Sequence, residues 1–148
     1  MSPNKNKSNQ IGIVLLAAGA SKRLGRPKQL LTFSGNTFLQ NSLKAANSSQ
    51  AFTTIVVLGS DSDSMVNKVN GNTHVIINPD WQEGMASSIR NGIKSLLDEE
   101  PSADGVILMM VDQPYVDSVV LNNLIEAHKR SGKPIVACAY QNTFGPPA

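Results

Sequence analysis

Residues 15–31, LLAAGASKRLGRPKQLL, combine small residues and cations in one short segment between two apolar runs. Ala17, Ala18 and Gly19 are small enough for the backbone to approach a flat or bulky ligand closely. Four basic residues follow in quick succession: Lys22, Arg23, Arg26 and Lys28. Backbone N–H groups and side-chain cations together suit a phosphate group. The segment therefore indicates a phosphate-binding loop, and a solvated basic loop is the alternative.

The glycines of this loop fit neither of two common nucleotide motifs. Gly19 and Gly25 do not supply the three-glycine dinucleotide pattern, and there is no Gly-Lys-Ser/Thr, which excludes a P-loop. Pro27 fixes the backbone directly before Lys28, which limits where that side chain can reach.

A second candidate is Asp112, which directly follows the apolar run at 105–111. A carboxylate at the C-terminal end of a buried parallel strand opens onto the ligand crevice, and its hard oxygen atoms suit Mg²⁺. A turn or cap aspartate is the alternative, because Pro114 and Asp117 follow. Asp117 itself is expected to cap a helix.

The third segment is NPDWQEGMASSIRNGI, residues 78–93. Asn78 closes a predicted strand, and Gly84 with the paired serines Ser87 and Ser88 lies around the start of the next helix. Helix N-termini present unpaired N–H groups, and serine hydroxyls there either cap the helix or bind a ligand.

Other residues with chemical potential are expected to be structural. Trp81 and Met85 are expected to pack, since no second aromatic residue accompanies the tryptophan. His74 and His128 have no nearby serine or cysteine partner, so they do not support a hydrolase triad. Cys138 is the single cysteine, which gives neither a disulfide nor metal-ligand spacing, and it is expected to be buried.

The elements that must position these residues follow from hydrophobic periodicity. Apolar runs predict five strands, and amphipathic segments predict four helices between them. The strands are expected at 11–17, 53–59, 74–78, 105–111 and 134–140, and the helices at 37–47, 61–69, 84–97 and 117–131. The alternation predicts a three-layer α/β/α fold with a mostly parallel sheet. Ligands bind beyond the carboxyl ends of such strands, where the three segments lie.

Composition bounds the class of protein. The chain has 148 residues, 41% of them hydrophobic, which is typical of a single globular domain. A net charge of +2 does not favour nucleic-acid binding. Residues 1–10 are polar and are expected to form a disordered tail, with the folded domain at 11–148. No secretory signal or membrane span is expected, and the lone cysteine fits a reducing cytoplasm.

Taken together, the three segments resemble the MobA-like NTP transferases, nucleotidyltransferases that act on the molybdenum cofactor. LLAAGASKRLGRPKQLL is similar to the family's signature, and NPDWQEGMASSIRNGI and DQP follow in the family's order and spacing. Ala-Ala-Gly followed by Pro-Lys resembles the cytidylyltransferase branch, because guanylyltransferases tend to show Ala-Gly-Gly and Asp-Lys. The resemblance implies a nucleotide-diphospho-sugar transferase-like, Rossmann-like fold. It also implies Mg²⁺-dependent transfer of CMP from CTP to the terminal phosphate of molybdopterin, with release of pyrophosphate.

The resemblance also implies roles for individual residues. Arg23 and Lys28 would hold the triphosphate and, with Asp112 as the Mg²⁺ ligand, would form the catalytic set. The end of the first strand would hold cytosine and ribose through its backbone. The nucleotide-binding residues implied are Leu16, Ala17, Ala18, Gly19, Arg23, Lys28, Asn78, Gly84 and Ser88.

The family pattern continues past residues 145–147 into further strands and a C-terminal helix, whereas this sequence stops at Ala148. The domain is therefore expected to be C-terminally incomplete, without part of the cofactor-binding side and any second metal-binding carboxylate there. The implied partners are CTP, molybdopterin and an apo molybdenum hydroxylase as client, with no nucleic acid or membrane. Two alternatives stay open: transfer to another acceptor, such as a sugar or polyol phosphate, and a non-catalytic nucleotide- or cofactor-binding chaperone.

Overall fold

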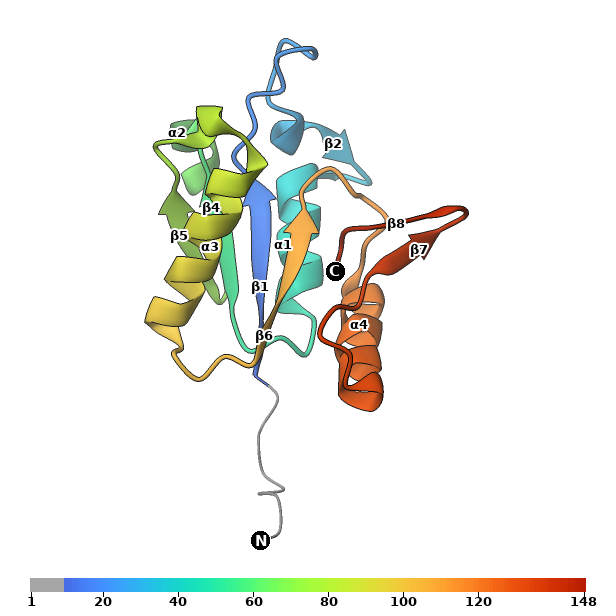
Figure 1. Cartoon of the computed structure of the whole chain (residues 1–148). Helices are drawn as coiled ribbons and strands as arrows, with labels where there is room; N and C mark the ends of the chain where they lie inside the picture. The colour runs from blue at the N-terminus through green and yellow to red at the C-terminus, as the bar shows by residue number, and fades with distance from the viewer. Residues whose placement is uncertain (1–9) are drawn as a thin grey trace, which may run out of the picture.

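A computed structural model describes residues 10–148 (Figure 1). Its central sheet has four parallel strands in the order β5-β4-β1-β6. Their bounds are β1 Ile11–Ala17, β4 Thr54–Leu58, β5 Thr73–Ile77 and β6 Gly105–Met110. The first four strands expected from the sequence are thus confirmed, with ends shifted by at most one residue.

Strand β1 is the centre of the molecule. All seven of its residues are buried, because β4 and β6 pair with its two edges and helices cover both faces. A strand in that position has no side facing water, which is why its sequence is an unbroken apolar run.

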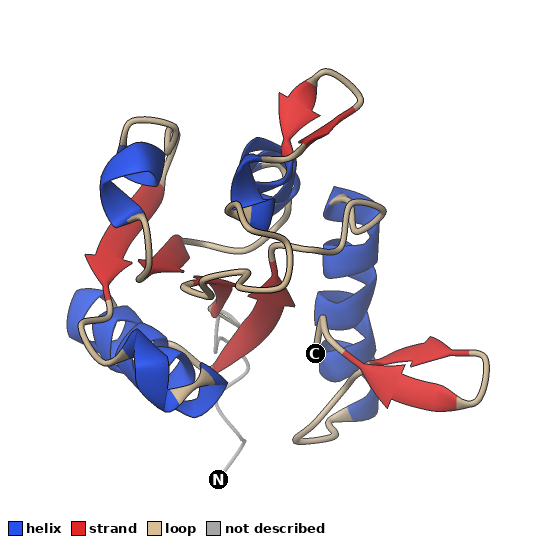
Figure 2. Cartoon of the chain, turned by 90° about the horizontal axis from the view of Figure 1, so that it is seen from above, coloured by secondary structure: helices blue, strands red, loops and turns tan. Residues whose placement is uncertain are grey.

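Helices cover the sheet on both faces (Figures 1 and 2), which confirms the three-layer α/β architecture. α3 (Met85–Glu99) packs on one face, and α1 (Phe38–Asn47) and α4 (Ser118–Ser131) pack on the other. The side chain of Asp117 accepts a hydrogen bond of 3.0 Å from the Val120 N–H, so its expected role as a helix cap is confirmed. α2 (Ser62–Val66) covers only five of the nine residues expected to be helical there.

Close packing of α3 on β1 depends on a glycine. A Cβ atom built on Gly92 would overlap Cγ1 of Val14, a buried side chain of β1. The helix backbone therefore approaches the sheet more closely than any residue with a side chain would allow.

The strand order creates a switch point between β1 and β6. From β1 the chain adds β4 and then β5 on one side, and it then returns to add β6 on the other side. Where the order of adding strands reverses in this way, a crevice opens at the C-terminal ends of the two neighbouring strands, here β1 and β6. The fold itself thus selects where a ligand binds.

The fifth expected strand, at 134–140, is wrong as a member of this sheet. Only Cys138–Tyr140 is a strand, β7, and it pairs antiparallel with β8 (Thr143–Gly145) in a separate hairpin. A two-residue connection, with Gln141 at a φ of 45°, closes this hairpin locally. Cys138 is half-buried there and packs against the core, so the expectation that it is buried is only partly right.

Small elements connect the larger ones. They are two short 3-10 turns and a two-stranded hairpin: η1 Lys28–Leu30, η2 Trp81–Glu83, β2 Thr32–Phe33 and β3 Asn36–Thr37. The tail expected at 1–10 lies outside the described residues except for Gln10, whose backbone exchanges hydrogen bonds with Asp104. Within the described part of the chain, every helix is too short or too polar to cross a membrane.

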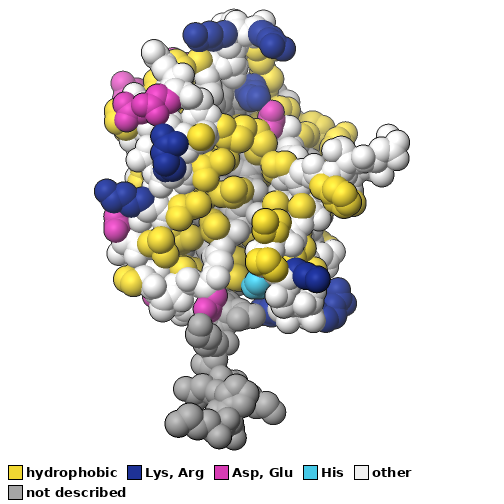
Figure 3. Space-filling view, in the orientation of Figure 1, with side chains coloured by type: hydrophobic (Ala, Val, Ile, Leu, Met, Phe, Trp, Pro, Cys, Tyr) yellow, Lys and Arg dark blue, Asp and Glu magenta, His cyan; other side chains and the backbone are white. Residues whose placement is uncertain are grey.

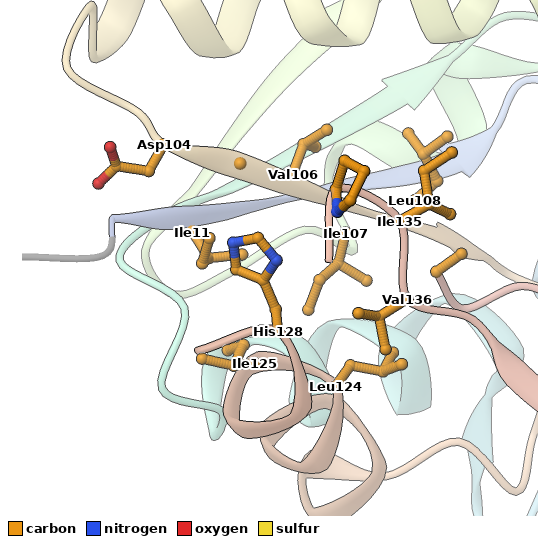
Figure 4. Close-up of a pocket in the computed structure, with 13 residues that line it drawn as sticks. Ile11, Asp104, Val106, Ile107, Leu108, Leu124, Ile125, His128, Ile135 and Val136 are labelled. Atoms are coloured by element: carbon orange, nitrogen blue, oxygen red, sulfur yellow. The ribbon is translucent and has the colours of Figure 1, made fainter. Parts of the chain in front are cut away.

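Strand β6 is an edge of the sheet, and an apolar groove of about 310 Å³ separates it from α4 and residues 134–136 (Figure 4). Apolar side chains gather across this side of the molecule in Figure 3. Leu108 and Ala148 exchange N–H···O hydrogen bonds of 2.8 and 3.3 Å, so the backbone at Ala148 pairs with the edge. His128 lies in the groove wall with Nδ1 2.9 Å from the Lys133 carbonyl oxygen, which agrees with its expected structural role.

Candidate active site

A cavity of about 210 Å³ lies at the C-terminal ends of β1 and β6, as the switch-point rule requires. Four segments line it. They are residues 16–19 at the end of β1, residues 28–29 of η1, residues 110–112 at the end of β6, and the start of α3 with Trp81, Gly84, Met85 and Ser88. All three segments singled out in the sequence therefore meet at one place.

Ten residues are predicted to bind nucleotide or metal or to act in catalysis. Asp112 and seven of the others line the cavity, and two do not. Those in the wall are Leu16, Ala17, Ala18, Gly19, Lys28, Gly84 and Ser88. Asn78 and Arg23 lie outside it. The sequence also assigned Trp81 and Met85 to packing. Trp81 does pack on the apolar cluster beside α3, but it lines the cavity as well, and Met85 is 50% exposed.

An ion pair joins the two halves of the cavity. Nζ of Lys28 lies 2.7 Å from Oδ2 of Asp112, although the two residues are 84 positions apart in the chain. The two side chains are 37% and 34% exposed, so both charges remain accessible from the cavity. A ligand with an anionic group and a bound cation can replace this ion pair. The anionic group would then bind Lys28, and the cation would bind Asp112.

The basic loop is closed by hydrogen bonds to Ser21, near its beginning. The Lys28 N–H donates to Ser21 Oγ at 3.1 Å, and the Leu24 N–H donates to the Ser21 carbonyl at 2.9 Å. Ser21 itself adopts a φ of 51°, a left-handed conformation that costs a non-glycine residue about 1–2 kcal/mol. The loop thus closes on Ser21 and presents Lys28 to the cavity.

Arg23 is exposed within this loop, which rises beyond the ends of the strands in Figure 1. Its position differs from that of Lys28, because no wall of the cavity includes Arg23. The predicted role of Arg23 is therefore not reflected in the walls of the cavity, and it stays a prediction.

Asn78 connects β5 to α3 beneath the cavity. It is fully buried, and its Nδ2 donates to the hydroxyls of Ser87 and Ser88 at 2.8 and 3.0 Å. Its Oδ1 accepts from the Asp80 N–H and from Asn91 Nδ2, each at 2.9 Å. Both ends of the amide are used within the protein, so Asn78 holds the start of α3 in place and acts on the cavity through Ser88.

The N-terminus of α3 forms one wall of the cavity. Gly84 caps the helix with a φ of 109°, and Gly84, Met85 and Ser88 line this wall. A 15-residue helix carries a partial positive charge at this end, which attracts anions. Lys28 and the helix end therefore both favour an anionic ligand.

Asp112 is the residue that could hold a metal ion. Among the residues that the structure describes, no cluster of three or more His, Cys, Asp or Glu side chains occurs. A single carboxylate still fits Mg²⁺, since this ion is usually held by one or two carboxylates together with substrate phosphates and water. The donor set fits a metal that binds jointly with a phosphate-bearing ligand.

A parallel sheet with a cationic loop, a helix N-terminus and a carboxylate at its switch point is an arrangement suited to enzymes that act on nucleoside triphosphates. The chain belongs to the MobA-like NTP transferase domain family, whose pattern matches residues 13–148. It is therefore a member of a family of nucleotidyl-transferring enzymes.

Two curated relatives span most of this chain. Nicotine blue oxidoreductase of Paenarthrobacter nicotinovorans is 31% identical over 135 residues, which cover 90% of this chain and 63% of that protein. Purine catabolism protein PucB of Bacillus subtilis (strain 168) is 28% identical over 144 residues, covering 90% of this chain and 67% of that protein. The chain thus spans about two thirds of the length of these relatives.

Solved structures confirm the expected nucleotide-diphospho-sugar transferase-like fold. Rv0371c of Mycobacterium tuberculosis H37Rv superposes with a TM-score of 0.83 at 32% identity, over 96% of this chain and 71% of that one. A manganese complex of Rv0371c gives a TM-score of 0.77 at 29% identity, over 93% of this chain and 68% of that one.

Proposed function

We propose that this protein transfers CMP from CTP to the terminal phosphate of molybdopterin and releases pyrophosphate in a Mg²⁺-dependent reaction. The observation that carries the proposal is the Lys28–Asp112 pair in the wall of a cavity formed by the Ala17–Gly19 backbone. Membership in the family supports nucleotidyl transfer, and the Ala-Ala-Gly and Pro-Lys forms of the loop favour CTP over GTP.

The proposed step is an in-line displacement at phosphorus. An oxygen of the molybdopterin phosphate attacks the α-phosphorus of CTP and forms a new P–O bond. The bond from the α-phosphorus to the oxygen that bridges to the β-phosphate breaks, and pyrophosphate leaves with that electron pair. The attacking phosphate is already an anion, so no proton has to be removed, and the main barrier is the approach of two anions. Positioning and charge neutralisation are then the two tasks of the protein.

The described residues divide these tasks between them. The backbone from Ala17 to Gly19 holds the cytosine and ribose, and Gly84 and Ser88 close the pocket from the side of α3. Lys28 neutralises charge at the α-phosphate, and the exposed Arg23 meets the departing pyrophosphate from the loop. Asp112 would hold Mg²⁺, and the chemistry supplied there is further neutralisation of the phosphate oxygens. Rv0371c has been solved as a manganese complex, which supports a divalent ion as part of the proposed reaction.

The chain spans 63% and 67% of the length of its two curated relatives, so the identity of the acceptor is part of the proposal. Molybdopterin as acceptor and an apo molybdenum hydroxylase as client follow from the sequence resemblance. A cytoplasmic setting is supported by the lone Cys138, which a reducing compartment would keep as a thiol.

The test is a pyrophosphate-release assay with CTP or GTP, with Mg²⁺, and with a panel of acceptors that contains molybdopterin, sugar phosphates and polyol phosphates. The proposal expects release with CTP and molybdopterin, and a loss of release in Asp112→Asn. Release of pyrophosphate with a sugar or polyol phosphate, but not with molybdopterin, would mean that this phosphate is the acceptor instead. Binding of CTP without release from any acceptor would favour the non-catalytic chaperone.

The name of the P. nicotinovorans relative gives a second candidate, since it belongs to an oxidoreductase. The pyrophosphate of a nicotinamide dinucleotide would meet the same positive charges, namely the ammonium group of Lys28 and the positive end of the α3 helix dipole. NADPH therefore belongs in the binding panel, and stabilisation by NADPH but not by CTP would favour a reductase instead.

A further inference from the structure

Gln29 is a fully buried polar residue in the wall of the active-site cavity. It follows Lys28 in the short turn η1, and its side chain reaches back to the end of β1. The Nε2 group donates one hydrogen bond of 2.8 Å to the carbonyl of Ala17 and another of 2.9 Å to the carbonyl of Gly19. One amide group thus binds the loop on both sides of Ala18.

These two bonds set the direction of the loop's own donors. In a trans peptide the carbonyl of one residue and the N–H of the next point in opposite directions. Because the Ala17 and Gly19 carbonyls point to Gln29, the N–H groups of Ala18 and Ala20 point away from it. The intervening Ala18 carbonyl accepts from the Ser60 N–H at 3.3 Å, so the loop is held from a second side.

The amide is the side chain that this position requires. A single nitrogen with two protons satisfies two carbonyls, whereas a methionine of similar length has no donor and a glutamate would set a carboxylate oxygen against both. Gln29 Oε1 is buried and has no hydrogen-bond partner in the described structure. The side chain therefore keeps both donors on the loop and leaves its own acceptor unsatisfied, which is uncommon for a buried polar atom.

We propose that Gln29 is a positioning residue for nucleotide binding: it orients the Ala17–Gly19 backbone so that the loop's N–H groups face the nucleotide before the nucleotide arrives. The proposal rests on the proposed function, because it assigns the nucleotide to this loop. Gln29 acts through the loop and does not touch the ligand's reacting atoms.

The test compares Gln29→Met and Gln29→Glu with the wild type and with Gln40→Met. The Oε1 atom of Gln40 accepts from the Thr37 N–H in the capping box of α1, and Gln40 does not line the cavity, so its loss should lower stability without changing nucleotide affinity. The measurements are thermal unfolding, calorimetric titration with Mg²⁺ and CTP, and amide NMR signals of Ala18 and Ala20 in the absence of nucleotide.

Gln29→Met is expected to weaken CTP binding by about 10-fold or more and to shift or broaden both alanine amide signals. Gln29→Glu is expected to bind weakly near pH 8 and to recover part of its affinity near pH 5. Burial raises the pKa of a carboxyl group, and the protonated acid can donate one of the two lost bonds. A merely structural glutamine would not give this pH-dependent rescue.

Wild-type affinity in folded Gln29→Met, or unchanged alanine amide signals, would overturn the inference. So would failure of both variants to fold, because a positioning role must be separable from the core. If the wild type does not bind CTP, the proposed function fails, and the alanine signals still decide the role of Gln29 in ordering the loop.

Discussion

Replacing Lys28 by methionine separates the roles of this residue in the fold and in the chemistry. Methionine keeps an unbranched apolar stem and removes the ammonium group. The pair with Asp112 is short, at 2.7 Å, but both partners are about a third exposed. Such pairs contribute about 1 kcal/mol or less to stability. For a domain of this size, that loss lowers the unfolding midpoint by only about 2–4 °C.

The effect on transfer should be far larger. Removing one donor aimed at developing charge typically slows the chemical step by about 10²–10³-fold, which corresponds to about 3–4 kcal/mol. The assay is single-turnover pyrophosphate release at saturating CTP, with thermal unfolding of the same samples. Lys22→Met is the matched control, since Lys22 is an exposed cation of the same loop that lies outside the cavity wall.

The same substitution makes a prediction for the metal. In the free protein the Lys28 ammonium occupies the cation position at Asp112, so its removal should tighten binding of Mn²⁺ alone. A charge pair at 2.7 Å in water is worth about 1.5 kcal/mol, or about a tenfold change in affinity. Unfolding of Lys28→Met, an unchanged transfer rate, or weaker Mn²⁺ binding than in the wild type would refute the assignment of Lys28 to the site.

Three further substitutions test the site and its supports. Asp112→Asn should remove the Mg²⁺ dependence of CTP binding, and a binding curve that still responds to Mg²⁺ in a titration would take Asp112 out of the site. Gly92→Ala should lower the free energy of unfolding by about 1–3 kcal/mol in urea melts, because its Cβ would overlap the buried Val14; a neutral result would mean that α3 can shift. Asn78→Ala removes four hydrogen bonds and should cost about 2–4 kcal/mol of stability and weaken CTP binding through Ser88. Full CTP affinity in folded Asn78→Ala would show that the start of α3 does not need this support.

The sheet could be predicted because burial leaves its mark on the sequence. β1 is apolar throughout, since it is covered on both faces and paired on both edges. The segment at 134–140 has a similar composition, yet its pairing partner is the nearby β8 rather than β6. Composition indicates whether a strand is buried, but it does not indicate which strand lies beside it. The partner strand β8 is short and its Phe144 side chain is exposed, so no buried apolar pattern marks it as a strand in the sequence.

The site was predictable to the level of its segments and less so to the level of its atoms. The switch-point rule was enough to bring the first loop, Asp112 and the start of α3 together. The burial of Asn78 and the bonds of Gln29 depend on side-chain directions that spacing does not encode. The only sequence signal for Gln29 is a polar residue directly before an apolar pair, in a loop where the other polar residues are mostly cations.

The central claim is that the cavity binds CTP together with Mg²⁺, and thermal unfolding with CTP or GTP, each with and without Mg²⁺, tests it most directly. A ligand that binds only the folded state at 100 times its Kd adds about 2.7 kcal/mol of stability. For this domain we therefore predict a Mg²⁺-dependent rise of about 5–10 °C with CTP and little change with GTP. No rise with either nucleotide would contradict the claim, and a rise with GTP alone would contradict the assignment to cytidylyl transfer.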